Sequence, residues 1–199
     1  MDTTIPPTTV DAADQPDLLA RNIRVGSRIW AASQAFFFLA FFFAFLYLRA
    51  LNTSGLWRGW PHHHPSPSIA FGVAILICVL GSAAVARGAV LVAPESWRVT
   101  AWAALALALA AVGLQSAQFS SLGFGPTDAA YASVFVGWSG LFALFLLGTC
   151  YWLATVIGDV SRAGGVQEVR AAALDGVGFV LQVLAGVEIA AFILLYVVK

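Results

Sequence analysis

The sequence predicts an all-α integral membrane protein, a bundle of five transmembrane helices. Hydrophobic residues make up 60% of the 199-residue chain and charged residues only 10%, whereas soluble globular domains carry about 25% charged residues. The apolar residues lie in five continuous stretches, each near the roughly 20 residues that a helix needs to cross a bilayer. Continuous rather than alternating runs exclude a transmembrane β-barrel, and in lipid such a run can satisfy its own backbone only as a helix.

The first two predicted helices cover residues 25–50 and 67–92. The apolar run of the first lies between Arg28 and Arg49, and seven of its ten residues at 36–45 are Phe. The second follows a link rich in Gly, Pro, Trp and His, and its apolar run stops at Arg87. Residues 1–22 precede them as a mobile acidic tail, because 1–20 contain four Asp and no Lys or Arg. The same lack of basic and apolar residues argues against a signal peptide.

The remaining three predicted helices cover residues 97–121, 128–158 and 170–198. The third is bounded by short turns, the fourth contains no charged residue from 129 to 158, and in the fifth only Gln182 and Glu188 interrupt the apolar run from 176 to 198. No link is long enough to separate two domains, so residues 23–199 form one transmembrane domain.

The distribution of basic residues predicts a cytoplasmic N-terminus and an outside C-terminus. Short cytoplasmic loops of membrane proteins carry an excess of Lys and Arg. With the N-terminus inside, the inner side receives seven basic residues and the outer side three: Arg21, Arg24, Arg28, Arg87, Arg98, Arg162 and Arg170 against Arg49, Arg58 and Lys199. The zero net charge gives no indication of nucleic-acid binding.

Polar side chains within the spans are few, and each needs a hydrogen-bond partner in hydrocarbon. They are expected to face other helices and to form an internal polar lattice, with packing rather than catalytic roles. Gln115 and Gln118 are three residues apart and share a helix face. The predicted lattice comprises Gln34, Gln115, Gln118, Tyr131, Ser139, Gln182 and Glu188.

Glu188 is the one carboxylic acid of this predicted lattice. It lies 11 residues before Lys199, or about 16 Å along a helix axis at 1.5 Å per residue, near the bilayer middle. It is interpreted either as a proton or ion site or as an acid that hydrogen-bonds to a neighbouring subunit. A proton relay normally needs several ionisable groups, and no second carboxylic acid and no basic side chain lies within the apolar stretches.

No metal site, cofactor site or catalytic constellation is predicted in this chain. The three histidines are adjacent, His62, His63 and His64, and lie in a link rather than in a span. Three neighbouring residues without a nearby Cys or carboxylate rarely complete a metal shell. Haem and copper in helix bundles are usually held by His, so the chain is expected to be colourless.

Several segments together resemble subunit III of the haem-copper oxidases, in its short five-helix bacterial form. Residues 115–122 read QSAQFSSL, similar to the family's Gln-x-x-Glu-aromatic-x-x-Leu, and residues 131–135 read YASVF, close to its Tyr-x-Ser-x-Phe. Residues 137–142 read GWSGLF where the family has Gly-Phe-His-Gly-Leu-His. Gln34 stands at the position of an intramembrane Glu, and Gln182 at that of a His. The resemblance covers residues 24–199 and includes helix number and order.

The resemblance implies a non-catalytic accessory subunit of a respiratory terminal oxidase in the bacterial cytoplasmic (inner) membrane. Such a subunit packs on subunit I, which carries the haem and copper, in a complex with subunit II that reduces oxygen to water and pumps protons. It also binds phospholipid, and here Arg28 and Trp30 are expected near the lipid headgroups. Three alternatives stay open: a subunit III homologue of a nitric oxide reductase or another respiratory complex, a small transporter that uses Glu188, and a structural assembly factor.

Overall fold

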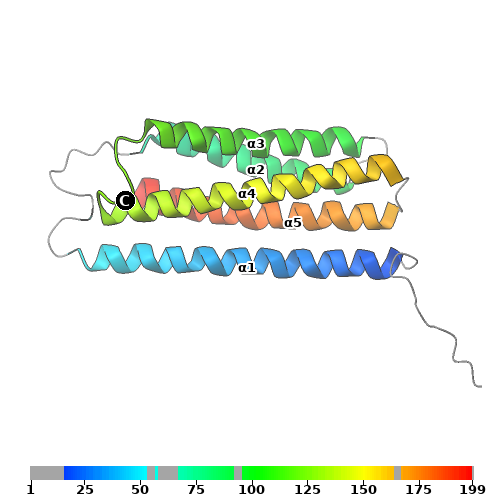
Figure 1. Cartoon of the computed structure of the whole chain (residues 1–199), viewed down its shortest axis with the longest axis horizontal. Helices are drawn as coiled ribbons and strands as arrows, with labels where there is room; N and C mark the ends of the chain where they lie inside the picture. The colour runs from blue at the N-terminus through cyan, green and yellow to red at the C-terminus, as the bar shows by residue number, and fades with distance from the viewer. Residues whose placement is uncertain (1–15, 53–56, 58–66, 92–95, 164–166, 199) are drawn as a thin grey trace, which may run out of the picture.

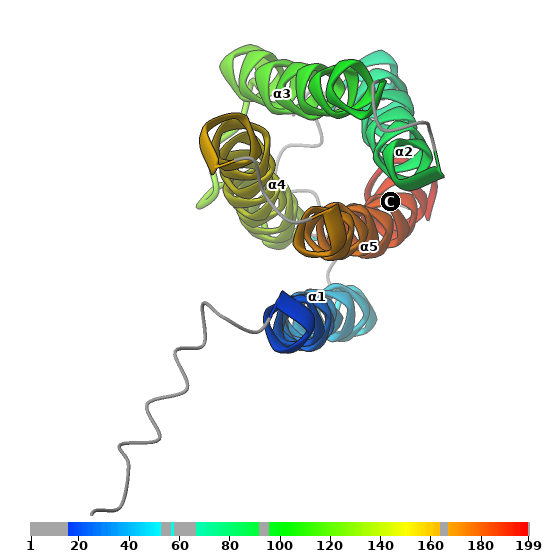
Figure 2. The same ribbon diagram turned by 90° about the vertical axis from the view of Figure 1, so that its right-hand side faces the viewer.

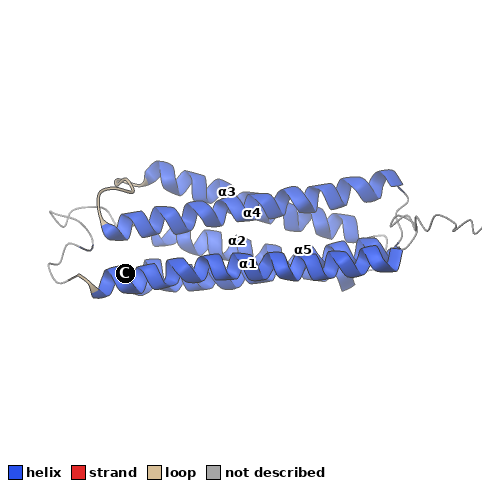
Figure 3. Ribbon diagram, turned by 60° about the horizontal axis from the view of Figure 1, so that its bottom comes forward, coloured by secondary structure: helices blue, strands red, loops and turns tan. Residues whose placement is uncertain are grey.

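Five long helices make up almost all of the structure, a computed structural model that describes residues 16–52, 57, 67–91, 96–163 and 167–198. Within those ranges the chain contains helices and no strand (Figure 3). The elements are α1 (Pro16–Ala50), α2 (Ile69–Leu91), α3 (Trp97–Ser121), α4 (Ala130–Ala163) and α5 (Gln167–Phe192), which continues as the π-helical segment η3 (Ile193–Val198). All five helices are long and apolar enough to cross a membrane, so this is a multi-pass membrane protein.

The helix bounds agree with the predicted spans to within three residues, except that α1 begins earlier than predicted and α4 ends at Ala163 rather than at 158. α3 covers the predicted 97–121, and α2 differs from its prediction by two residues or fewer at each end. α1, however, begins at Pro16, so the predicted tail of residues 1–22 is too long. Proline is favoured at the first helical position because its missing N–H has no intrahelical acceptor there, and Asp17 in the first turn interacts favourably with the helix dipole. Residues 1–15 lie outside the described residues.

Four of the helices enclose a common interior, and the fifth lies beside them. Viewed along the bundle, α2, α3, α4 and α5 form a ring, and α1 packs on the outside of that ring against α5 (Figure 2). Successive helices run antiparallel, so α1 and α5 begin at the same end and run side by side in the same direction (Figure 1). The interior of the ring and the seam of α1 are therefore two separate environments for side chains.

Small residues let the helices approach closely. The buried face of α3 consists largely of alanines at helical spacing, among them Ala101, Ala104 and Ala108, and the hydroxyl of Ser82 in α2 donates a 2.8 Å hydrogen bond to the Ala104 carbonyl. Close packing of small residues is a main source of helix association in lipid, where no hydrophobic driving force acts between helices.

Polar contacts join helices at one end of the bundle. Arg87 near the end of α2 forms an ion pair with Asp175 of α5. The buried ring of Trp97 at the start of α3 lies 5.6 Å from the Arg98 guanidinium and 5.3 Å from that of Arg170, distances at which a cation interacts with an aromatic face. These contacts fix the register of α2, α3 and α5 at this end.

Candidate functional site

A hydrogen-bonded network lies inside the four-helix ring, at the end where α3 finishes. The predicted pairing of two glutamines on one helix face is confirmed, because Gln115 Nε2 donates to Gln118 Oε1 at 3.1 Å. Gln118 Nε2 in turn donates to the Tyr196 hydroxyl at 2.7 Å, and that hydroxyl lies 3.0 Å from Gln118 Oε1. The network therefore joins α3 to η3 through side chains that are all buried.

Tyr196 is the member of this network that the sequence did not reveal. Its ring stacks on Phe192 with centroids 5.4 Å apart and meets Phe135 of α4 edge-on at 5.7 Å. An added Cβ at Gly72 in α2 would lie 2.8 Å from the Tyr196 ring, so this approach requires a glycine. A tyrosine near the end of an apolar stretch is typical of the interfacial aromatic belt. The sequence therefore gives no indication that Tyr196 lies in the interior of the bundle.

A second tyrosine anchors the same end of the bundle. The hydroxyl of Tyr131, near the start of α4, donates a 2.6 Å hydrogen bond to the carbonyl of Leu195. Carbonyls in the last turn of a helix lack intrahelical donors, and Tyr131 supplies one. The predicted lattice residues Gln115, Gln118 and Tyr131 thus lie together around η3, with Tyr196 between them.

Glu188 is buried within its own bundle, with 6% of its surface exposed. It lies eight residues before Tyr196 in the chain, and both side chains are buried. This placement argues against the interpretation in which the carboxyl hydrogen-bonds to a neighbouring subunit. Among the described residues, no hydrogen bond to the Glu188 carboxyl is present.

The remaining predicted lattice residues do not join the network. Gln182 lies on the exposed outer face of α5, so its assignment to the interior is wrong. α5 packs against α1, α2 and α4. Gln182 lies on the part of the α5 surface that none of these three helices covers. Ser139 is buried in α4, but no hydrogen bond joins it to another predicted lattice residue in the described part of the chain.

Gln34 is separate from the network because it belongs to α1. It lies on the buried stripe of that helix with 2% of its surface exposed. Neither its Oε1 nor its Nε2 has a hydrogen-bond partner among the described residues. The predicted lattice is therefore divided into an interior network, an isolated amide in the α1 seam and an amide on the outer surface.

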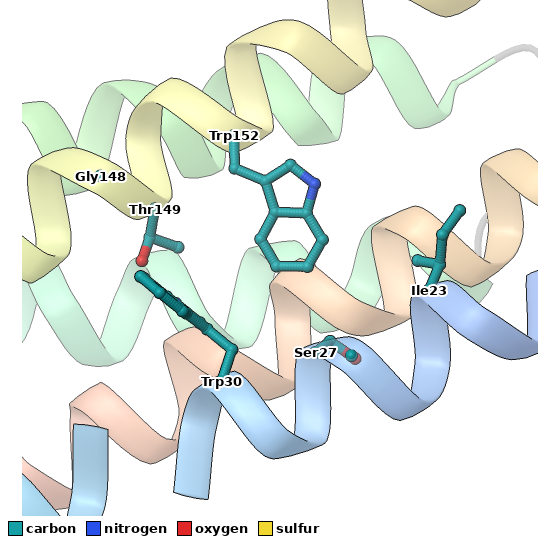
Figure 4. Close-up of a pocket in the computed structure, with 7 residues that line it drawn as sticks. Ile23, Ser27, Trp30, Gly148, Thr149 and Trp152 are labelled. Carbon is teal, nitrogen blue, oxygen red and sulfur yellow. The ribbon is translucent and has the colours of Figure 1, made fainter. Parts of the chain in front are cut away.

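A groove opens between α1 and α4, outside the ring. It has a volume of about 370 Å³, and Trp30 from α1 and Trp152 from α4 form its opposing walls (Figure 4). Gly176 lets Ser27 of α1 and Trp152 of α4 pack closely against α5, since a Cβ at position 176 would lie 3.0 Å from Ser27 and 3.1 Å from Trp152. The remaining lining residues are Ile23, Gly26, Ser27, Gly148 and Thr149.

The groove presents an apolar surface even though two hydroxyl residues line it. Ser27 Oγ donates to the Arg24 carbonyl at 2.9 Å, and Thr149 Oγ1 donates to the Phe145 carbonyl at 2.9 Å. Because both hydroxyls are satisfied by their own helices, the walls can offer mainly van der Waals contact. Arg28 is exposed on α1, and Trp30, which forms one wall of the groove, is 49% exposed.

Groups that could hold a metal are not found among the described residues, which contain no cluster of three or more His, Cys, Asp or Glu side chains. His62, His63 and His64 lie outside the described residues.

No model of a known protein family matches the chain, and no match to a curated protein sequence was found.

Proposed function

We propose that the chain is a non-catalytic accessory subunit of a respiratory membrane complex, related to subunit III of the haem-copper oxidases. The observation that carries this proposal is the Gln115–Gln118–Tyr196 network. The polar groups inside the ring are chiefly neutral amides and phenols that hydrogen-bond to one another. Such groups hold helices together. Because they are hydrogen-bond partners of one another, they are not free to bind a reacting molecule.

The α1–α4 groove supports a role in binding phospholipid. Its walls are apolar and its volume of about 370 Å³ lies within the range of ligand pockets, about 300–1,000 Å³. Trp30, the partly exposed wall residue, is of the type that prefers the headgroup level. Arg24 and Arg28, exposed on the same end of α1, would meet the phosphate while an acyl chain lies between Trp30 and Trp152.

The proposal assigns the chemistry to partner subunits. Haem and copper would reside in subunit I, and subunit II would complete the core of a complex that reduces oxygen and pumps protons. The bundle end that carries Arg24, Arg28 and Arg87 would face the cytoplasm, which gives a cytoplasmic N-terminus in a bacterial inner membrane.

The test is purification of the tagged full-length chain from its native membrane in a mild detergent. We expect haem absorbance in the purified complex, a histidine-rich multi-pass subunit in its mass spectrum and phospholipid in stoichiometric amounts. After the subunits are separated, haem should stay with the partner. A purified chain that carries no partner, or that ligates haem itself, would contradict the proposal.

A pair of glycine variants tests the lipid site. Nothing lies within 4 Å of an added Cβ at Gly148, in the groove, or at Gly113, on the exposed face of α3. Gly148→Leu should fill the groove and displace bound phospholipid, whereas Gly113→Leu should leave it bound. Equal lipid content in the two variants by native mass spectrometry would exclude the groove as the site.

Glu188 favours one alternative, a small transporter. A carboxyl buried in a helix bundle commonly marks an ion pathway. That alternative predicts transport by the purified chain in liposomes, whereas the accessory role predicts none. A nitric oxide reductase as the host complex differs only in the partner, which mass spectrometry would identify.

A further inference from the structure

Gln182 is unusual among the polar residues on the outer surface of the spans. The exposed hydroxyls of Ser33, Ser116 and Ser120 each donate to a carbonyl of their own helix, at 3.0, 3.0 and 3.1 Å. The amide of Gln182 has no hydrogen bond within the described part of the chain. A polar group in hydrocarbon without a partner is costly, so Gln182 requires a partner from outside this chain.

The depth of Gln182 makes that requirement strict. It lies 15 residues after the start and 16 residues before the end of the span Gln167–Val198, hence near the bilayer middle. A glutamine side chain at that depth is too short to reach the headgroups or water. Acyl chains carry no hydrogen-bonding group, so lipid cannot satisfy the amide.

The surface around Gln182 has the shape of a docking face. Gln182 belongs to a stripe of exposed residues spaced three or four apart along α5 and η3, namely Phe179, Gln182, Gly186, Ile189 and Ile193. An added Cβ at Gly186 meets nothing within 4 Å, so packing inside the chain does not require this glycine. Gly186 instead lines a groove of about 270 Å³ to which α1, α4 and α5 all contribute, with Ala35 and Leu39 on the α1 side and Trp138 on the α4 side.

We infer that this α5 stripe, centred on Gln182 and Gly186, binds a transmembrane helix of another polypeptide that carries a hydrogen-bonding side chain at mid-membrane depth. The inference rests on the proposed accessory role and names the surface by which the chain would join its complex. Small residues at such a surface allow close helix approach. A second copy of this chain fits less well, because a two-fold contact would place groove against groove and leave both unfilled.

Photo-crosslinking in native membranes tests the surface. A benzophenone amino acid is placed in the full-length chain at positions 182, 186, 189 and 193, and at positions 109, 113 and 116 on the exposed face of α3 as controls. We expect adducts from the α5 positions, mapping by peptide mass spectrometry to a membrane-spanning segment of another protein with a polar residue at the crosslinked depth. An adduct to a second copy of this chain, or to lipid alone, would overturn the inference.

Matched substitutions separate the amide from general packing. In a chain with the crosslinker at position 189, Gln182→Leu should lower the adduct yield by about threefold to twentyfold, the range set by interhelical hydrogen bonds in membranes. Ser116→Ala, which removes an exposed polar group from α3, should leave the yield unchanged. Gly186→Leu should lower the yield by filling the groove, and Gly113→Leu should not. Unchanged yield in both α5 variants would refute the inference.

The two proposals fail in different ways. If a haem-bearing complex forms and its crosslinks come from α3 rather than α5, the docking surface is wrong and the accessory role stands. If α5 crosslinks to a transmembrane helix of a protein that contains no haem, the docking surface stands and the oxidase assignment fails.

Discussion

The hydrogen bond between Gln118 and Tyr196 should contribute a measurable coupling energy. Tyr196→Phe removes only the hydroxyl, because the ring keeps its stacking on Phe192 and its edge contact with Phe135. The lost contacts are those of 2.7 and 3.0 Å to the Gln118 amide. Interhelical hydrogen bonds in membrane proteins average about 0.6 kcal/mol and reach about 1.7 kcal/mol. The buried, two-contact geometry places this pair in the upper half of that range.

A double-mutant cycle isolates this energy. Gln118→Leu alone breaks the bond to Tyr196 and also leaves Gln115 Nε2 without its acceptor, so it should cost more than Tyr196→Phe. In the double variant the hydroxyl is already gone, and the cost of Gln118→Leu should fall by about 1 kcal/mol or more. The measurement is the free energy of unfolding in mixed micelles, followed by helical circular dichroism.

A second cycle serves as the control. Ser116→Ala combined with Tyr196→Phe should be additive, because Ser116 is exposed and its hydroxyl bonds to the carbonyl of Val112. Independent sites add to within about 0.3–0.5 kcal/mol. A Gln118–Tyr196 coupling no larger than that of the control pair would refute the network as a source of stability.

Three further predictions concern single positions. Gly72→Ala should lower the free energy of unfolding by about 1–3 kcal/mol, because its Cβ would lie 2.8 Å from the Tyr196 ring; thermal unfolding in detergent measures this. Arg87→Ala should cost less than about 1 kcal/mol, and the difference should shrink at high salt, because the ion pair with Asp175 is solvent-exposed. Glu188→Gln should leave proton flux into liposomes at the level of the wild-type chain, which we expect to equal that of empty liposomes.

Each of these has a contrasting outcome. Gly88, in the same helix as Gly72, has nothing within 4 Å of an added Cβ, so Gly88→Ala should stabilise by about 0.5–1 kcal/mol; equal effects at the two glycines would disprove the steric argument. A salt-independent loss at Arg87 would point to packing rather than charge. Proton flux in the wild type that Glu188→Gln abolishes would support the transporter instead.

The spans were predictable because the bilayer constrains them directly. Hydrocarbon thickness sets helix length, and the cost of unpaired backbone polar groups excludes any other conformation. For that reason 97–121 is a helix in both the prediction and the structure. The pairing of Gln115 with Gln118 was predictable for a similarly local reason, since residues three apart on a helix are neighbours whatever surrounds them.

The direction in which each polar residue faces was not predictable. A soluble helix marks its inner face by apolar residues and its outer face by charged ones, but lipid is as apolar as the interior of the bundle. Gln182 and Gln118 are the same residue type within equally apolar runs, yet one lies outside and the other inside. Neither spacing nor composition distinguishes them.

The sequence by itself determined the number and order of the membrane helices and the apolar core of each, because those depend on how each segment partitions into lipid. Only the tertiary structure decided which residues meet: Tyr196 with Gln118 across the ring, Gly72 beneath the tyrosine, and Trp30 opposite Trp152 in the groove. These contacts depend on helix rotation and on the pairing of segments far apart in the chain. Side-chain packing sets helix rotation and helix pairing. Because lipid is as apolar as the interior of the bundle, the order of residues along the chain does not reveal that packing.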